Sequence, residues 1–167
     1  MIPEPIKKFI DNFSKLPALG PRLVTRLAFY LVNMDKNFLR DLENSFAELK
    51  KLDRCERCFF LKEASEKLCD ICANPARDKT LVAVIEKETD LLALEKTGLF
   101  KGQYLLIGEL PERGILEVSQ KLRLKSLKIR IEKELGGKIK EIVIALNPNT
   151  FGDFVAGLIR EDFKGLA

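Results

Sequence analysis

The sequence predicts an α+β chain of several modules: a helical N-terminal region, a four-cysteine metal module, and a small α/β domain with a mainly parallel sheet. Three observations predict this class. Apolar residues recur at helical spacing through residues 1–53. The chain's four cysteines form two closely spaced pairs. After residue 80, short continuous apolar runs, typical of strands buried on both faces, alternate with helical stretches.

Composition restricts the classes of function. With 167 residues, 46% hydrophobic and 32% charged, the chain has the length of one ordinary domain or a few small modules and can bury a core. No apolar run reaches about 18 residues, and the N-terminus MIPEPIKKFIDNF lacks an apolar signal region, so we expect a cytoplasmic protein with reduced cysteines and no membrane partner. The absence of histidine excludes histidine-based catalysis and histidine metal ligands. The net charge of +4 is a mild indication of a polyanionic partner.

Residues 1–53 are expected to be helical, with a tight turn near residue 20. Two sets of apolar residues recur at helical spacing: Ile6, Phe9, Ile10 and Phe13, and then Leu39, Leu42, Phe46 and Leu49. Between them, Pro21 follows Gly20, and proline suits the first turn of a helix because its missing N–H has no partner there.

The segment 16–31 fits a helix-hairpin-helix. In that motif, backbone N–H groups at the start of the second helix, here at Gly20, bind a phosphate without contacting a base. Arg22 and Arg26 lie one turn apart and would flank the phosphate. The alternative is an ordinary helical corner with two solvated arginines, and a motif this short does not decide between them.

Residues 54–78 form the expected metal module. Its four cysteines are Cys55, Cys58, Cys69 and Cys72. Two C-x₂-C pairs separated by ten residues predict a closed tetrahedral site with a structural role, holding one Zn²⁺ per chain, although iron is also compatible with four thiolates. Buried or disulfide-paired cysteines are the less favoured alternative. Four basic residues make the module a candidate secondary contact with nucleic acid: Arg54, Arg57, Lys62 and Lys67.

Residues 79–167 are expected to form the α/β domain. The runs 81–85, 104–107 and 142–146 predict strands, and helical stretches are expected near 89–97, 125–135 and 152–162. Strands that alternate with helices indicate a parallel sheet with right-handed crossovers.

Two acidic residues lie at predicted strand ends. Glu86 ends the first strand and Asp153 follows the last, where carboxylates can hold Mg²⁺ for phosphoryl chemistry. Such sites usually need several carboxylates, and Phe151 stands where another acid would help. We therefore favour a structural or vestigial acidic pair.

The segment 121–140 carries eight Lys and Arg residues against two Glu residues. Such a run is usually a solvated helix face, and the alternative is a surface that contacts DNA through its phosphates.

In this order the modules resemble the RecR family of bacterial recombination mediators. The resemblance rests on LPALGPRLVTRLAFYL at 16–31, the four cysteines, NPARDKTLVAVIEKETDLLALEKTGLFKGQYLLIGEL at 74–110, and EIVIALNPNTFGD at 141–153. It covers nearly the whole chain, and the stretch 74–110 is its most specific part.

The resemblance implies a helix-hairpin-helix (1–53), a C4 zinc finger (54–78) and a Toprim domain (79–167) without enzymatic activity. It implies a dimer or tetramer ring that encircles double- or single-stranded DNA irrespective of sequence. It also implies a nucleoid-associated role with RecO and RecF in placing RecA on gapped or single-stranded DNA. Carried over by position, Arg22 and Arg26 match the DNA-contacting residues, the four cysteines match the zinc ligands, and Glu86 and Asp153 match the Toprim acids.

Three departures from the family pattern stand out. Phe151 replaces an acid in the family's T-x-E-G-E run, the loop after Gly108 keeps only part of the usual sequence, and the family continues beyond Ala167 with closing strands. We therefore expect an incomplete Toprim domain with an unpaired sheet edge, in which ring closure and partner docking would lack the contacts of the family's closing strands. The competing functions are a magnesium-dependent Toprim nuclease or primase-like enzyme and a rubredoxin-like iron carrier.

Overall fold

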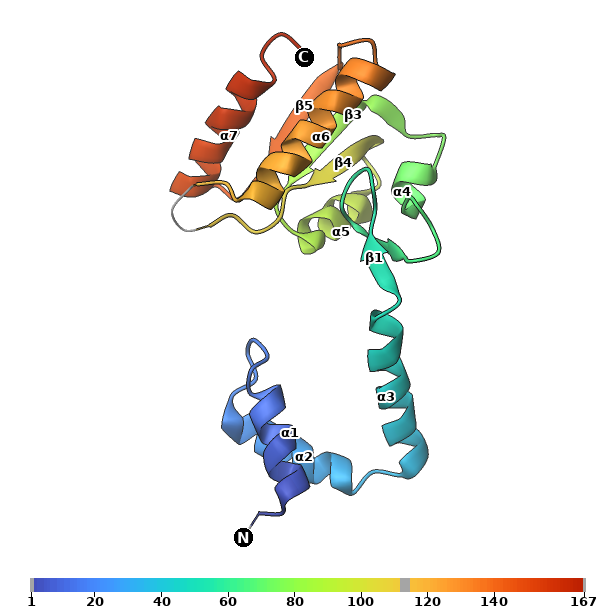
Figure 1. Ribbon diagram of the computed structural model, residues 1–167, viewed down its shortest axis with the longest axis vertical. Coiled ribbons are helices and arrows are strands. Elements are labelled where there is room, and N and C mark those ends of the chain that lie inside the picture. Colours follow the sequence, from blue (N-terminus) through green and yellow to red (C-terminus); the bar gives the residue numbers. More distant parts are fainter. Residues whose placement is uncertain (1, 112–114, 167) are drawn as a thin grey trace. The chain divides into compact units, whose positions relative to one another are not determined.

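The structure is a computed structural model that describes residues 2–111 and 115–166. The chain divides into two compact units, Met1–Lys51 and Leu52–Ala167, here called the helical unit and the sheet unit. The predicted fold class is confirmed: N-terminal helices, a four-cysteine cluster, and a parallel three-stranded sheet with helices, as in a Toprim-like α+β protein (Figure 1).

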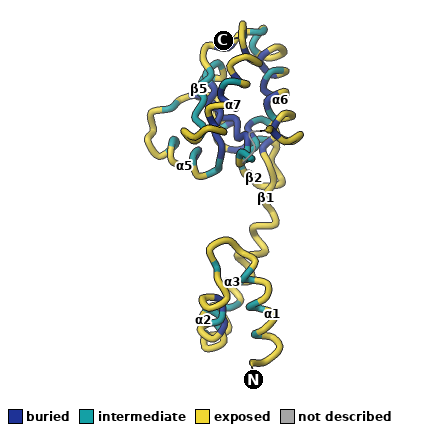
Figure 2. Tube along the Cα trace, turned by 90° about the vertical axis from the view of Figure 1, so that its left-hand side faces the viewer, coloured by how far each residue is buried: buried dark blue, intermediate teal, exposed yellow. Residues whose placement is uncertain are grey.

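The helical unit holds three helices: α1 (Glu4–Phe13), α2 (Pro21–Val32) and α3 (Lys36–Leu49). Proline lies in the first turn of both α1 and α2. Helix α3 begins where the Asp35 carboxylate accepts hydrogen bonds from Asn37 N at 2.7 Å and Phe38 N at 3.1 Å. Among the described residues of the unit, only Val24 and Ala28 are buried, and Figure 2 shows the rest as intermediate or exposed.

The sheet unit begins with the cysteine module, which consists of strand β1 (Leu52–Arg54), strand β2 (Leu61–Glu63) and helix α4 (Asp70–Ala73). The two strands pair antiparallel. This hairpin was not expected from the sequence, because strands of three residues are too short to show a periodic pattern. Strand β1 spans the boundary expected between residues 53 and 54.

The remaining elements are β3 (Asp78–Ile85), α5 (Glu88–Thr97), β4 (Gly102–Leu106), α6 (Val118–Glu134), β5 (Glu141–Ala145) and α7 (Thr150–Asp162). The strands are parallel in the order β4-β3-β5, and they occupy the three apolar runs that predicted them. Helix α6 begins at Val118 rather than near residue 125. Glu117 and Gln120 form its capping box, in which Glu117 N donates to Gln120 Oε1 at 2.9 Å.

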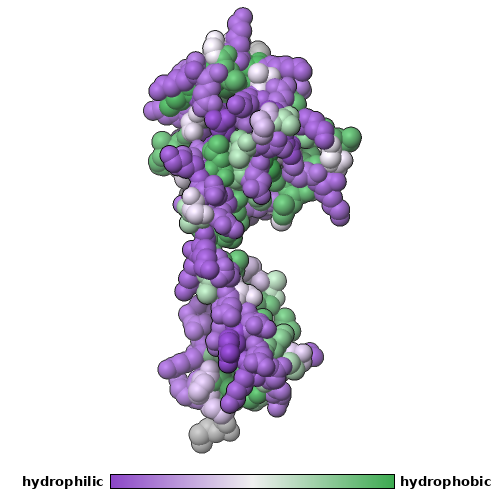
Figure 3. Space-filling view, turned by 90° about the vertical axis from the view of Figure 1, so that its right-hand side faces the viewer, coloured by the Kyte–Doolittle hydropathy of each residue, from purple (hydrophilic) through white to green (hydrophobic). Residues whose placement is uncertain are grey.

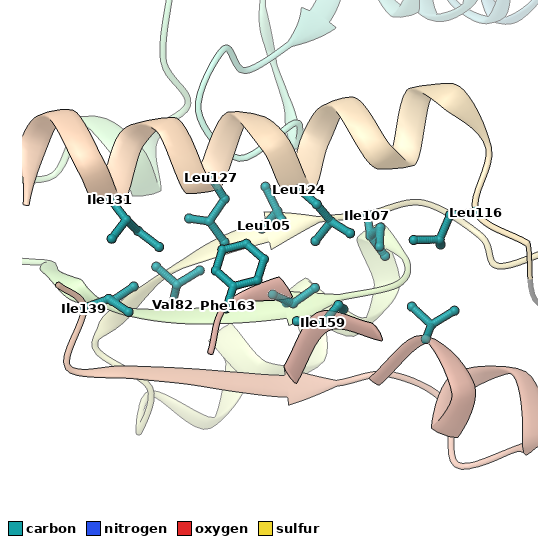
Figure 4. Packing of buried hydrophobic residues seen from close by; sticks show 12 residues of the cluster. Val82, Leu105, Ile107, Leu116, Leu124, Leu127, Ile131, Ile139, Ile159 and Phe163 are labelled. Carbon is teal, nitrogen blue, oxygen red and sulfur yellow. The ribbon is translucent and has the colours of Figure 1, made fainter. Parts of the chain in front are cut away.

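The core lies on both faces of the sheet. On one face, α6 and α7 cover the strands, and Figure 4 shows Leu127 and Ile131 of α6 pointing toward Val82 and Leu105. On the other face, Leu91 of α5 packs against a second cluster: Ala83, Ile85, Tyr104 and Leu106. Burial on both faces explains why each strand is a continuous apolar run.

Candidate functional site

The cysteine module brings all four sulfurs together. They lie within 4.8 Å of one another, and the four residues are buried. The Sγ atoms of Cys58 and Cys69 are 3.5 Å apart. A tetrahedral zinc site with Zn–S bonds of about 2.3 Å places its sulfurs about 3.8 Å apart, so this arrangement suits a four-thiolate metal site.

Backbone turns position the ligands. Phe59 N donates to Cys55 O at 3.0 Å and Cys55 N donates to Phe60 O at 2.7 Å, which folds the first C-x₂-C into a tight loop. Two amides point at sulfur: Phe60 N donates to Cys58 Sγ at 3.5 Å, and Cys69 N donates to Cys55 Sγ at 3.4 Å. Such contacts orient ligands and stabilise negative charge on them.

Contacts among the sulfurs also control the thiol protons. Hydrogen bonds among the sulfurs shift the thiol pKa values in opposite directions: they raise the pKa of Cys58 and Cys72 and lower that of Cys55 and Cys69. Four thiolates this close together repel one another, so the fully deprotonated cluster needs a cation. The donor set therefore fits a divalent metal ion.

The cysteine module is anchored on the sheet through its first loop. Leu106 N donates to Cys58 O at 2.9 Å at the outer side of β4. Phe59 adopts a left-handed backbone, with φ of 64°, and packs against both cores. The Arg123 guanidinium lies 5.1 Å from the centre of the Phe59 ring. A left-handed phenylalanine costs about 1–2 kcal/mol, which this packing offsets.

Most of the module's basic residues are engaged within the protein. Arg54 pairs with Glu88 at 2.5 Å and Arg57 pairs with Glu134 at 3.0 Å. Lys62 is buried, whereas Lys67 is exposed. These pairs weaken the interpretation of the module as a secondary contact with nucleic acid.

The hairpin turn leaves the start of α2 open. Ala18 has a left-handed backbone, with φ of 64°, and Gly20 is the extended N-cap residue, without a side-chain cap on the helix. Arg22 and Arg26 are both exposed on the first two turns. The structure thus places the sequence-predicted residues on one accessible helix start.

The two strand-end acids lie in different environments. Glu86 is 5% exposed, and its carboxylate accepts from Asn147 Nδ2 at 2.7 Å and from Leu110 N at 3.3 Å. Asp153 is exposed in the first turn of α7. In the described part of the chain, the only group of three or more potential metal ligands is the cysteine cluster. The hydrogen bonds give Glu86 a structural role: it ties the ends of β3 and β5 to the loop after Gly108.

Comparison with known proteins identifies the family. No family model matches the chain. Recombination protein RecR of Chloroflexus aurantiacus is 34% identical over 169 residues, covering 99% of this chain and 79% of that protein. The Roseiflexus castenholzii and Herpetosiphon aurantiacus proteins of the same name are each 36% identical, covering 93% and 96% of this chain and 74% and 76% of their own lengths. This chain belongs to the RecR family.

The RecR resemblance drawn from the motifs is therefore confirmed. Sequence reasoning missed one partly buried polar network in this family member: the Glu95 carboxylate accepts from Arg77 and from Tyr104 Oη, the latter at 2.5 Å. These residues come from the segment before β3, from α5 and from β4. One polar side chain in each of three separate segments gives no spacing signal. Only the fold shows that they meet.

Sequence reasoning also missed Arg130. The run 121–140 was interpreted as a solvated helix face or a DNA-facing surface, yet Arg130 is 8% exposed on α6. A signal existed in the sequence, because Arg130 follows Leu127 by three residues and so lies on the apolar face of the helix. The solvated-face interpretation is wrong for this residue.

None of the helices in the described ranges 2–111 and 115–166 is long and apolar enough to cross a membrane.

Proposed function

We propose that this chain is a non-enzymatic, DNA-binding mediator of recombinational repair that works with RecO- and RecF-like proteins to load RecA on gapped or single-stranded DNA. The observation that carries the proposal is the match to recombination proteins over as much as 99% of the chain. Four features of the structure support it.

DNA binding is assigned to Gly20, Arg22 and Arg26. The N–H groups in the first turn of α2 have no side-chain cap, and Arg22 and Arg26, on the first two turns, are both exposed. A phosphate at this position would receive backbone hydrogen bonds, the favourable end of the helix dipole and two positive charges. None of these contacts depends on base sequence.

The metal is proposed to be one structural Zn²⁺ per chain, held by the four cysteines. Four thiolates leave no open coordination position, so the ion would supply folding energy rather than catalysis. It would hold the cysteine module against the edge of β4, where Cys58 O accepts from Leu106 N.

The absence of enzymatic activity is supported by the environment of Glu86. Its two oxygens already accept hydrogen bonds from Asn147 and Leu110, and Asp153 is exposed on α7. A magnesium-dependent Toprim enzyme needs carboxylates free to share a cation. We therefore favour a structural role for Glu86 over that alternative function.

Assembly into a ring is supported by the surface of the helical unit. Figure 3 shows apolar (green) side chains gathered on this unit, in the lower part of the picture. The large exposed apolar residues include Leu23, Phe29, Tyr30, Val32, Phe38, Phe46 and Leu49. A surface this apolar usually marks a protein interface. We propose that further copies of the chain cover it, because several subunits around one DNA multiply weak contacts.

The test is a pair of matched double variants. Arg22→Ala/Arg26→Ala removes the proposed phosphate contacts. Lys36→Ala/Arg40→Ala removes two exposed cations with the same spacing on α3, with the same change in net charge. Binding to duplex and single-stranded DNA is measured by fluorescence anisotropy between 50 and 200 mM salt, with oligomeric state checked in parallel.

The expected result follows from counterion release. Two lost phosphate contacts should reduce the salt slope on duplex DNA by about 1.8 per contacting subunit, which makes the variant about twelvefold less sensitive to that fourfold rise in salt. The control should retain nearly the wild-type slope. Equal losses of DNA affinity in the two double variants would mean that overall charge, and not the start of α2, determines DNA binding. Magnesium-dependent DNA cleavage abolished by Glu86→Gln would overturn the non-enzymatic assignment.

A further inference from the structure

A polar cavity separates the cysteine module from α6. Its volume is about 280 Å³. One wall is formed by Glu56 and Arg57, which lie between the first two cysteines, and by Leu68, which precedes the third. The opposite wall includes Arg130 and Glu134 of α6. The loops that carry three of the four cysteines therefore face a charged helix surface.

Arg130 is the unusual residue of this cavity. It is 8% exposed, and its Nε and Nη2 atoms are buried with no hydrogen-bond partner among the described residues. The other partly buried arginines of the sheet unit are satisfied: Arg57 by Glu134, Arg77 by Glu95, and Arg123 by Leu106 O. A buried, unpaired guanidinium is costly, so a nearby negative charge is needed to offset its desolvation.

The groups around Arg130 identify the source of that charge. Burial and the neighbouring Arg57 lower the pKa of Arg130, while Cys72, Glu134 and Cys58 raise it. Glu134 is 47% exposed and already pairs with Arg57. The other buried groups that can carry a negative charge are the sulfurs of Cys72 and Cys58, once they are thiolates.

The charge of those sulfurs depends on the metal. Four neutral thiols carry no charge, whereas a divalent ion with four thiolates carries a net charge of −2. Arg130, which is 8% exposed, is then stabilised more than a fully solvated cation would be, because a partly desolvated site screens charge less than water does. A bound oxyanion is a poorer fit for the cavity, since Glu56, Glu134 and the metal cluster outweigh its three cations, which are Arg57, Arg130 and Lys133.

We propose that Arg130 is the counter-charge of the metal tetrathiolate, so that metal occupancy and the packing of the C-terminal half of α6 stabilise each other. The inference rests on the proposed metal site. Arg130 acts as a positioning residue, and it does not bind the metal. With metal, its charge is compensated. Without metal, the same buried charge has no counter-charge and destabilises the folded state.

The test compares Arg130→Met, which removes the charge at similar length, with Arg130→Lys, which keeps it. Lys125→Met is the control on an exposed position of the same helix. Zinc affinity is measured by competition with a chromophoric chelator. Changes to residues that interact with metal ligands typically weaken metal binding 10- to 100-fold, and we expect Arg130→Met to fall in that range. Arg130→Lys should lose less zinc affinity, and Lys125→Met should bind zinc as tightly as the wild type.

A second measurement separates charge compensation from packing. Thermal unfolding is followed in the zinc-loaded and the chelated protein. Arg130→Met should raise the midpoint of the chelated protein while it weakens zinc retention, because methionine needs no counter-charge. A residue important only for packing would lower the midpoint in both states.

The outcomes are distinguishable. Wild-type zinc affinity in Arg130→Met, or equal destabilisation with and without zinc, would overturn the role of Arg130 and leave the metal site intact. A wild-type chain that binds no zinc would overturn the proposed metal site itself, and the inference with it.

Discussion

Glu86 offers the sharpest test of how the ends of the strands are held. Replacing it with alanine removes the acceptor of two hydrogen bonds, from Asn147 Nδ2 at 2.7 Å and from Leu110 N at 3.3 Å. Both donors would lose a partner in a region where Glu86 itself is 5% exposed. The change therefore affects the connection between β3, β5 and the loop after Gly108.

The magnitude follows from the two bonds. A short bond to a charged carboxylate contributes about 1.5–3 kcal/mol, and the longer one contributes about 0.5–1 kcal/mol. Removing a buried charge recovers part of its desolvation energy, so we expect a net loss near the lower end, about 2 kcal/mol. For a chain of this size that corresponds to a fall in the unfolding midpoint of roughly 4–8 °C.

The assay is urea and thermal unfolding of the metal-loaded chain, followed by circular dichroism. Glu86→Gln keeps the shape and one acceptor oxygen, so it should recover about half of the lost stability. Asp153→Asn is the control, since this exposed acid contributes only through the helix dipole, by less than about 1 kcal/mol.

Wild-type stability in Glu86→Ala would refute the structural role. So would a loss in Asp153→Asn as large as that in Glu86→Ala, since the two acids would then act as one site.

Two further predictions concern the glycines of α7 and the network of Arg77, Glu95 and Tyr104. In Gly152→Ala, the new Cβ would lie 2.0 Å from a backbone carbonyl oxygen of the loop after β5, so the free energy of unfolding should fall by roughly 2 kcal/mol or more. In Gly157→Ala the new Cβ meets nothing within 4 Å, so the free energy of unfolding should rise by up to about 1 kcal/mol. Chemical unfolding measures both changes. Burial raises the pKa of Glu95, but hydrogen bonds from Arg77 and Tyr104 outweigh it and hold the pKa below the ordinary value of 4.5. This carboxylate therefore stabilises the fold above about pH 4.5, and the stabilisation disappears as the pH falls through its lowered pKa. Unfolding measured from pH 7 to 3 should show a weaker pH dependence in Glu95→Gln, and an unchanged profile would contradict this assignment.

The sheet and the cysteine cluster were predictable because each leaves a local pattern. Strand β3 is buried on both faces, so its apolar residues are consecutive, and the metal ligands lie at a spacing that few other structures require. The β1–β2 hairpin left no such pattern, because it is held by pairing across the module rather than by its own periodicity.

Arg130 and Asn147 were not predictable in role for a related reason. Arg130 lies in a basic run, and composition alone favours solvent for such residues. Asn147 follows β5 in a sequence typical of a turn, and its contact with Glu86 spans 61 positions of the chain. In both cases the deciding partner is distant in sequence.

The bond between Cys58 O and Leu106 N has a consequence for solubility. Strand β4 is the outer strand on its side of the sheet, and the cysteine module covers part of its exposed hydrogen-bonding edge. Bare strand edges recruit strands from other molecules, which leads to aggregation. An ion held by the four sulfurs would thus also protect the protein from aggregation. After removal of the metal, we expect the chain to aggregate before its helices unfold.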